Sequence, residues 1–167
     1  MRRAGAALLV ATIGMAATTS GCSVGTTEIV GGGQAPTGVA PGPTLFFLDH
    51  DGDLTPQRRN TGRLGTVADA VSLLLTGPGD SDLSTDLPET DVTRVEAAVV
   101  GDVIDLTVPV SADDAGARGA DQIACTAITA FVLAVGAPTA TVRIGFTIGD
   151  ARSHRARDCP VLLNPAG

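Results

Sequence analysis

The chain has 167 residues, enough for one domain and a tail, and it contains no Trp, no Tyr and four Phe, so aliphatic side chains must build its core. Its eleven basic residues are all Arg, and eighteen acidic residues give a formal net charge of −7. Phosphate backbones and anionic lipid head groups repel such a surface, which argues against direct nucleic-acid binding.

Residues 1–21 have the pattern of a bacterial lipoprotein signal peptide. Arg2-Arg3 precedes an apolar run, Ala4–Ala17, which is shorter than the roughly 20 residues that a membrane span needs. Thr19-Ser20-Gly21-Cys22 resembles a lipobox, although the first position of that motif is usually Leu. We predict cleavage before Cys22, lipidation of its sulfur through a thioether, and anchoring to the extracytoplasmic face of the cell membrane. The alternatives are an ordinary secretory signal, or a buried helix with an incidental cysteine.

Residues 22–43 follow as a predicted tether. This stretch is rich in Gly, Pro and Thr and has no sustained helical or strand periodicity. It cannot bury enough apolar surface to offset the entropy of the chain, so we predict a flexible linker between lipid and domain. Removal of the signal peptide would leave nine Arg against eighteen acidic residues, a charge of −9.

The folded domain is predicted to span residues 44–150. Hydrophobic periodicity and turn residues give the order of its elements: a short apolar strand at Thr44–Leu48, a helix at Thr66–Thr76 that Gly77-Pro78 ends, strands at Thr93–Val100 and Val103–Val108 joined by Gly101-Asp102, a helix at Ala120–Val135, and an alternating strand at Thr141–Ile148. This β-α-β-β-α-β order predicts an α+β domain in which two helices cover one face of a four-stranded, mostly antiparallel sheet.

The stretch FFLDHDGDLTPQRR, from Phe46 to Arg59, raises the question of a calcium loop. An EF-hand loop needs Gly at its sixth position and Glu at its twelfth. A loop that starts at Asp49 has Leu54 and Asn60 at these positions. We therefore predict a turn after the first strand, in which Asp and Gly supply caps and a positive φ, and no metal site.

Cys125 and Cys159 remain after lipidation of Cys22. In an oxidising compartment such a pair is most simply a disulfide, which would tie the second helix to the C-terminal tail, residues 151–167. The alternative is two separate thiols, with Cys125 buried in the helix and Cys159 exposed.

A catalytic reading makes Cys159 a nucleophile and His154 its base, as in cell-wall peptidases. Nearby arginines could lower the pKa of the thiol, but the tail offers no helix N-terminus or rigid strand to hold the pair. We predict a protein that is not an enzyme and has no cofactor. Arg58-Arg59 could bind an anionic cell-wall polymer, although such a pair more often solvates a loop.

Four blocks of residues carry a family resemblance. They are Leu45–Asp49 with Asp51-Gly52, Leu54 and Arg58-Arg59; Ala70–Pro78; Leu83–Pro88 with Val99–Leu106; and Ala120–Ile123 with Thr126 and Ile128. In this order they resemble the GerMN domain, a module named after a spore germination and sporulation protein and found in envelope lipoproteins. The chain departs from that pattern at Cys125, where an aromatic is common, and at Ile148–Asp150, where an Asp-Gly turn is more usual.

The resemblance implies scaffolding or ligand binding rather than turnover, because the family offers no catalytic constellation to transfer. The expected partner is another envelope protein or a cell-wall polymer. A module that binds a small ligand or senses a signal is the alternative, and a pocket with convergent polar groups would favour it. A shared fold can host unrelated tasks, so no role in sporulation follows from the resemblance.

Overall fold

The structure is a computed structural model that describes residues 42–148 and 155–163. The predicted signal peptide, Cys22, nearly all of the tether and His154 lie outside the described residues. Within them the elements are β1 (Thr44–Leu48), β2 (Leu54–Arg58), α1 (Val67–Leu74), β3 (Glu96–Val100), β4 (Val103–Ser111), α2 (Ala112–Val135), β5 (Thr141–Ile148), β6 (Ala156–Arg157) and α3 (Pro160–Leu163).

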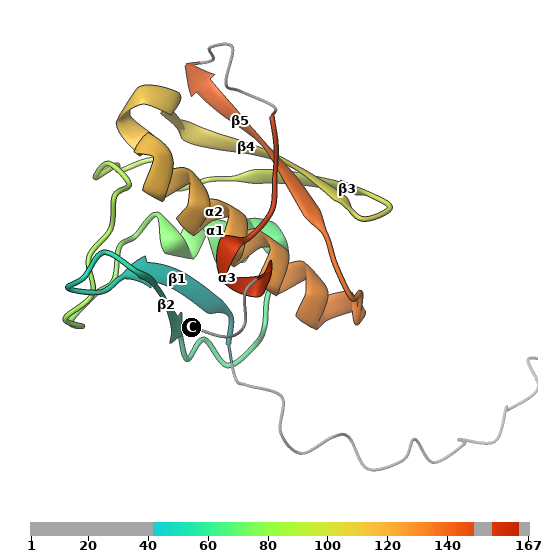
Figure 1. The fold of residues 1–167 in the computed structure, drawn as a ribbon, viewed down its shortest axis with the longest axis horizontal. Coiled ribbons are helices and arrows are strands. Elements are labelled where there is room, and N and C mark those ends of the chain that lie inside the picture. The colour runs from blue at the N-terminus through green and yellow to red at the C-terminus, as the bar shows by residue number, and fades with distance from the viewer. Residues whose placement is uncertain (1–41, 149–154, 164–167) are drawn as a thin grey trace, which may run out of the picture. The chain divides into compact units, whose positions relative to one another are not determined.

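The strands form two sheets (Figure 1). Strands β1 and β2 make an antiparallel hairpin, and the second sheet has four strands in the order β3-β4-β5-β6. Its outer pairs, β3–β4 and β5–β6, are antiparallel, while β4 and β5 are parallel. Parallel neighbours need a crossover connection, and α2 supplies it. The predicted α+β class is confirmed.

The membership of the four-stranded sheet differs from the prediction. Thr44–Leu48 pairs with β2 instead of joining that sheet, and β6 from the tail takes the fourth place. Strand β2 reads Leu-Thr-Pro-Gln-Arg, which has no apolar alternation and contains Pro56. Pro56 lies opposite Phe46, whose backbone N–H and C=O bond to side chains of α2. The Phe46–Pro56 pair is therefore a non-hydrogen-bonded pair, which is why a proline is tolerated there.

Helix α2 is the centre of the domain and packs against both sheets. One side of it contacts β1 and another contacts β4 and β5, as Figure 1 shows. Its core residues are fully or almost fully buried, among them Ile123, Ala124, Ala127 and Ile128. By length and composition α2 could cross a membrane, but 61% of its most apolar window is buried inside the domain, as in the core helix of a globular protein.

Helix α2 begins eight residues before the predicted start at Ala120. Ser111 caps its first turn by accepting a hydrogen bond from the backbone N–H of Asp114, at 3.0 Å. Gly116 then interrupts the helix with φ 57° and ψ −176°, a conformation that only glycine adopts readily. This first turn has no continuous apolar face, so periodicity could not reveal it.

Candidate functional site

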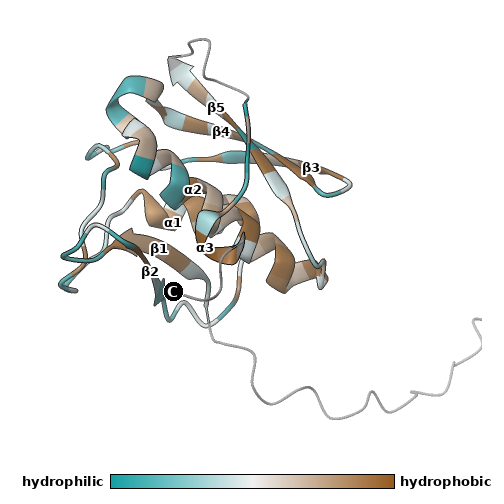
Figure 2. Cartoon of the chain, in the orientation of Figure 1, coloured by the Kyte–Doolittle hydropathy of each residue, from teal (hydrophilic) through white to brown (hydrophobic). Residues whose placement is uncertain are grey.

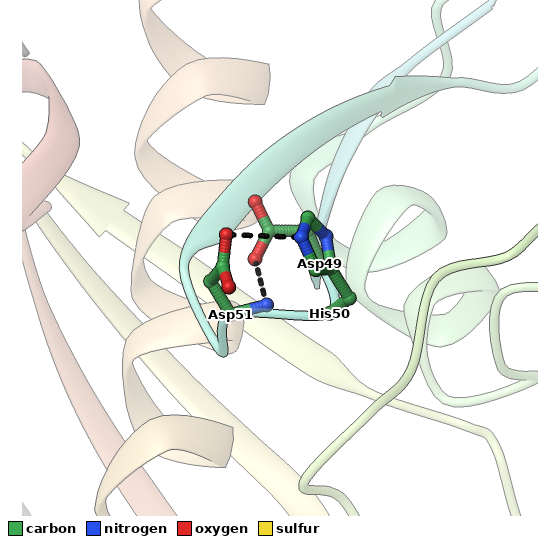
Figure 3. A group of neighbouring side chains, drawn as sticks. All are labelled: Asp49, His50 and Asp51. Atoms are coloured by element: carbon green, nitrogen blue, oxygen red, sulfur yellow. Dashed lines mark hydrogen bonds and ion pairs between the residues drawn. The ribbon is translucent and has the colours of Figure 1, made fainter.

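The turn between β1 and β2 is organised by the carboxylate of Asp49 (Figure 3). Its Oδ1 accepts hydrogen bonds from the backbone N–H groups of Asp51 and Asp53, at 3.0 and 2.9 Å, and its Oδ2 accepts one from the Thr55 hydroxyl at 3.2 Å. Gly52 has φ 80°. The hydrogen bond from the Asp53 N–H is the main cause that lowers the pKa of Asp49. The residues thus form the predicted turn.

Asp49, His50 and Asp51 place one possible metal-ligand atom each within 4.8 Å of one another. His50 Nε2 lies 3.1 Å from Asp51 Oδ2, and both side chains are largely exposed. The Asp49 carboxylate is already used by the turn, and the spacing of an EF-hand is not present. We assign no metal to this group.

Arg59 is used inside the domain instead of facing a partner. Its guanidinium donates to the carbonyl oxygen of Gly77 at 2.6 Å and to Gln57 Oε1 at 2.9 Å. It also lies over the ring of Phe47, 5.9 Å from the centroid. The side chain therefore fastens the hairpin to the end of α1. Of the two arginines considered for binding an anionic polymer, Arg58 is the exposed one.

Two fully buried polar side chains of α2, Gln122 and Thr126, bind the edge of β1 that faces away from β2. The Phe46 N–H donates to Thr126 Oγ1, and Gln122 Nε2 donates to the Phe46 carbonyl, each at 3.0 Å. Gln122 Oε1 also accepts from the Asp86 N–H at 2.9 Å. Buried polar groups in a core invite a functional reading, but here they satisfy backbone groups.

Cys125 and Cys159 are joined by a disulfide with an S–S distance of 2.02 Å. Cys159 is 2% exposed, in contrast to the exposed thiol of the alternative reading. Arg157 of β6 lies 3.3 Å from Asp121 of α2, so the tail is fastened to this helix at a second point. Because its sulfur is in the bond, Cys159 has no thiol to act as the nucleophile of a hydrolase.

A hollow of about 400 Å³ lies beside the disulfide. Its walls are mostly apolar and come from the second half of α2, the loop before β5 and the tail: Ile128, Val132, Pro138, Ala140, Cys159 and Leu162. Asp102 and Asp158 are its charged lining residues. This arrangement lacks the convergent polar groups that a specific small-ligand site needs.

Strand β3 is the open edge of the four-stranded sheet, and all five of its residues are exposed. It reads Glu-Ala-Ala-Val-Val, with Val99 45% and Val100 71% exposed. Figure 2 shows the hydrophobic colour of this strand toward its turn. Edge strands are usually protected from pairing with another chain by charged side chains, especially Lys, or by Pro; β3 has no Lys or Pro, and its one charged residue is Glu96 at its start. We take this edge as the candidate functional site.

Searches against protein-family models, curated proteins and solved structures gave no match. The resemblance to the GerMN domain therefore stays a hypothesis that rests on the four sequence blocks.

Sequence reasoning did not identify the open edge of β3. The residues of Thr93–Val100 predicted a strand of a hairpin, whereas the position of that strand in its sheet depends on pairing with distant segments. The one signal was the run Ala97–Val100, in which apolar residues follow one another without alternation beside a two-residue turn.

Proposed function

We propose that this chain is a non-enzymatic lipoprotein of the cell envelope, anchored through Cys22, whose GerMN-like domain docks onto another envelope protein. A cell-wall polymer is the other partner class. The lipobox-like residues and the tether support the anchoring, and the four sequence blocks support the family. The open, apolar edge of β3 is the observation that carries the docking function.

A free strand edge is a ready surface for β-augmentation, in which an extended segment of a partner adds a strand to the sheet. Backbone hydrogen bonds provide affinity, and side chains on alternate faces provide specificity. Strand β3 belongs to a sheet whose inner strands, β4 and β5, pack on α2. A rigid scaffold of this kind holds the edge in the extended geometry that pairing needs.

Site-specific photo-crosslinking in intact cells tests the docking function. A photoreactive residue at position 98 of β3 should give adducts with an envelope protein. The matched control is position 107 on β4, which is also exposed but lies between two paired strands. No adduct at position 98, or the same adducts from both positions, would contradict docking at this edge.

Cell fractionation tests the anchoring independently. Cys22→Ala, or treatment with the signal peptidase II inhibitor globomycin, should block maturation and release or mislocalise the protein. Unchanged membrane retention of Cys22→Ala would refute the lipid anchor and leave the docking function to stand on its own test.

A small-ligand function is the second candidate, and the one feature in its favour is the apolar volume of the hollow beside the disulfide, since polar groups do not converge there. A neutral apolar fluorescent probe such as N-phenyl-1-naphthylamine should then bind with saturation. Val132→Trp, which fills the hollow from α2, should abolish that binding. Saturable binding that survives Val132→Trp would place the probe elsewhere.

A further inference from the structure

Hydrogen-bond alternation fixes which backbone groups of β3 face outward. Val100 pairs with Val103 across a two-residue turn, so this is a hydrogen-bonded pair, and Ala98 and Glu96 also point their backbone groups toward β4. The N–H and C=O groups of Ala97 and Val99 therefore point away from the sheet. The next outward N–H along the strand, that of Val95, is already bonded to the Ser72 hydroxyl at 3.2 Å.

We infer that β3 pairs with β3 of a second copy of this chain, antiparallel and with Ala98 opposite Ala98, to make one continuous eight-stranded sheet across a two-fold axis. In this register Ala97 faces Val99 of the other copy, and Val99 faces Ala97. All four outward backbone groups of each strand then gain partners. This inference rests on the proposed docking function and names its partner.

Two neighbouring registers also keep the hydrogen-bond alternation, and each is worse. With Val99 on the axis, Glu96 of one copy faces Asp102 of the other, and like charges opposite each other destabilise a strand pair. With Ala97 on the axis, Val99 faces Val95, whose N–H is held by Ser72. The register centred on Ala98 avoids both conflicts, since Glu96 then faces Val100.

The same register places Arg94 of each copy opposite Asp102 of the other. Both side chains are exposed, and among the described residues neither has an ion-pair or hydrogen-bond partner for its charged group. Two symmetric Arg–Asp pairs form, one at each end of the paired strands. Exposed ion pairs contribute little affinity but select a register and disfavour others.

The pairing is expected to be weak in dilute solution. A five-residue edge buries far less than the roughly 1,200 Å² of a stable interface, and two acidic domains repel each other. Anchoring to a membrane confines the copies to two dimensions and raises their effective concentration. The experiment therefore uses the full chain in membranes of cells that produce it.

Cysteine scanning reads the register directly. Opposed residues of a non-hydrogen-bonded antiparallel pair have Cα atoms about 4.5 Å apart, within the range of a disulfide. Under mild oxidation Ala98→Cys should give a reducible dimer as its main product. Ala97→Cys and Val99→Cys are matched controls, because in this register each lies about 8 Å from its own copy and should crosslink at least tenfold less.

A charge swap then tests the ion pairs in the Ala98→Cys background. Arg94→Asp and Asp102→Arg should each reduce the dimer roughly tenfold, because each replaces two attractive contacts by two repulsive ones. The double variant Arg94→Asp/Asp102→Arg should restore it. An unchanged unfolding midpoint in every variant establishes that the turn and the domain remain folded.

Three results would overturn the self-pairing. They are a dominant dimer from Ala97→Cys or Val99→Cys, no dimer from Ala98→Cys, and failure of the double charge swap to restore crosslinking. Photo-adducts from position 98 with another protein, together with no dimer from Ala98→Cys, would refute self-pairing and retain the proposed docking function.

Discussion

Strands β1 and β3 each form one arm of an antiparallel hairpin, but they differ in whether the backbone groups of the outer edge have hydrogen-bond partners. On β1 the backbone groups of Phe46 bond to Thr126 and Gln122, and those of Leu48 bond to the backbone of Ser84 at 2.9 and 2.7 Å. On β3 the corresponding groups of Ala97 and Val99 lie on the outer edge, where no described strand pairs with them. The difference lies in the neighbours of each strand, since both strands are short and apolar.

At the opposite side of the four-stranded sheet, the tail of the chain pairs with the outer edge of β5. Strand β6 pairs with β5 through Val142–Arg157 and Arg143–Ala156, and the disulfide at Cys159 holds the tail against α2. The outer edge of β1 is therefore covered at Phe46 and Leu48, and that of β5 is covered at Val142 and Arg143. An edge that stays open beside such covered edges is a candidate surface for a partner.

Removal of the disulfide is expected to have the largest effect on the covered edges. The bond closes a sequence separation of 34 residues, and chain entropy gives it about 4 kcal/mol of the unfolding free energy. Cys125→Ala/Cys159→Ala should lose about this amount in urea unfolding, and reduction of the wild-type chain should reproduce the loss. Two reactive thiols in the denatured, unreduced protein would show that the bond is not formed.

The Gln122 amide bonds to the outer edge of β1, and its removal is expected to destabilise the domain. Gln122→Leu keeps the side-chain volume but leaves the Phe46 carbonyl and the Asp86 N–H without partners, which should lower the unfolding free energy by about 2–4 kcal/mol. Arg118→Leu, one turn earlier on the exposed side of α2, is the control and should change it by less than about 0.5 kcal/mol. Equal effects of the two variants would mean that Gln122 acts only as a space filler.

Hydrophobic periodicity in the sequence correctly predicted the helices and strands whose residues follow such a pattern. The bounds of Thr44–Leu48 and Thr141–Ile148 agree with β1 and β5, and Gly101, at φ 65°, begins the predicted two-residue turn. Strand β2 was missed as a partner because its polar residues and proline give no alternation. The pairing of strands is a long-range property, so periodicity left open which strands would be neighbours.

The candidate site was beyond sequence reasoning for the same reason. Edge status follows from the whole strand order, and the apolar residues of β3 look like core residues until β4 is seen to have its other side on β5. At Asp49 the sequence was sufficient to reject a calcium loop, because the residues that such a loop requires could be checked position by position. Chemical requirements with fixed spacing are readable from a sequence, whereas exposure of an edge is not.

The turn of the β1–β2 hairpin is held by the carboxylate of Asp49, so the stability that this turn contributes should depend on pH. Hydrogen bonds lower the pKa of Asp49 below its usual value of about 4. The carboxylate therefore stabilises the folded state above about pH 5, and this contribution is lost as the pH falls through the lowered pKa. Asp49→Asn should thus be less stable than the wild type at pH 7 and approach it at pH 2.5 in urea unfolding. Asp102→Asn, in the turn of the β3–β4 hairpin, controls for loss of a charge. A deficit of Asp49→Asn that is the same at both pH values would contradict this role.

Ala97→Pro should have the smallest effect on stability and the clearest effect on the open edge. The Ala97 N–H points away from β4, so a proline there removes no hydrogen bond of the hairpin, and the unfolding free energy should change by less than about 1 kcal/mol. The pyrrolidine ring also removes a donor that a paired strand needs, so self-crosslinking through Ala98→Cys should fall to background. Large destabilisation by Ala97→Pro would mean that this N–H is bonded within the domain, and the two strand edges would then not differ.

Thr126→Val is the matching variant for the covered edge of β1. It removes the acceptor of the Phe46 N–H and should lower the unfolding free energy by about 1–3 kcal/mol.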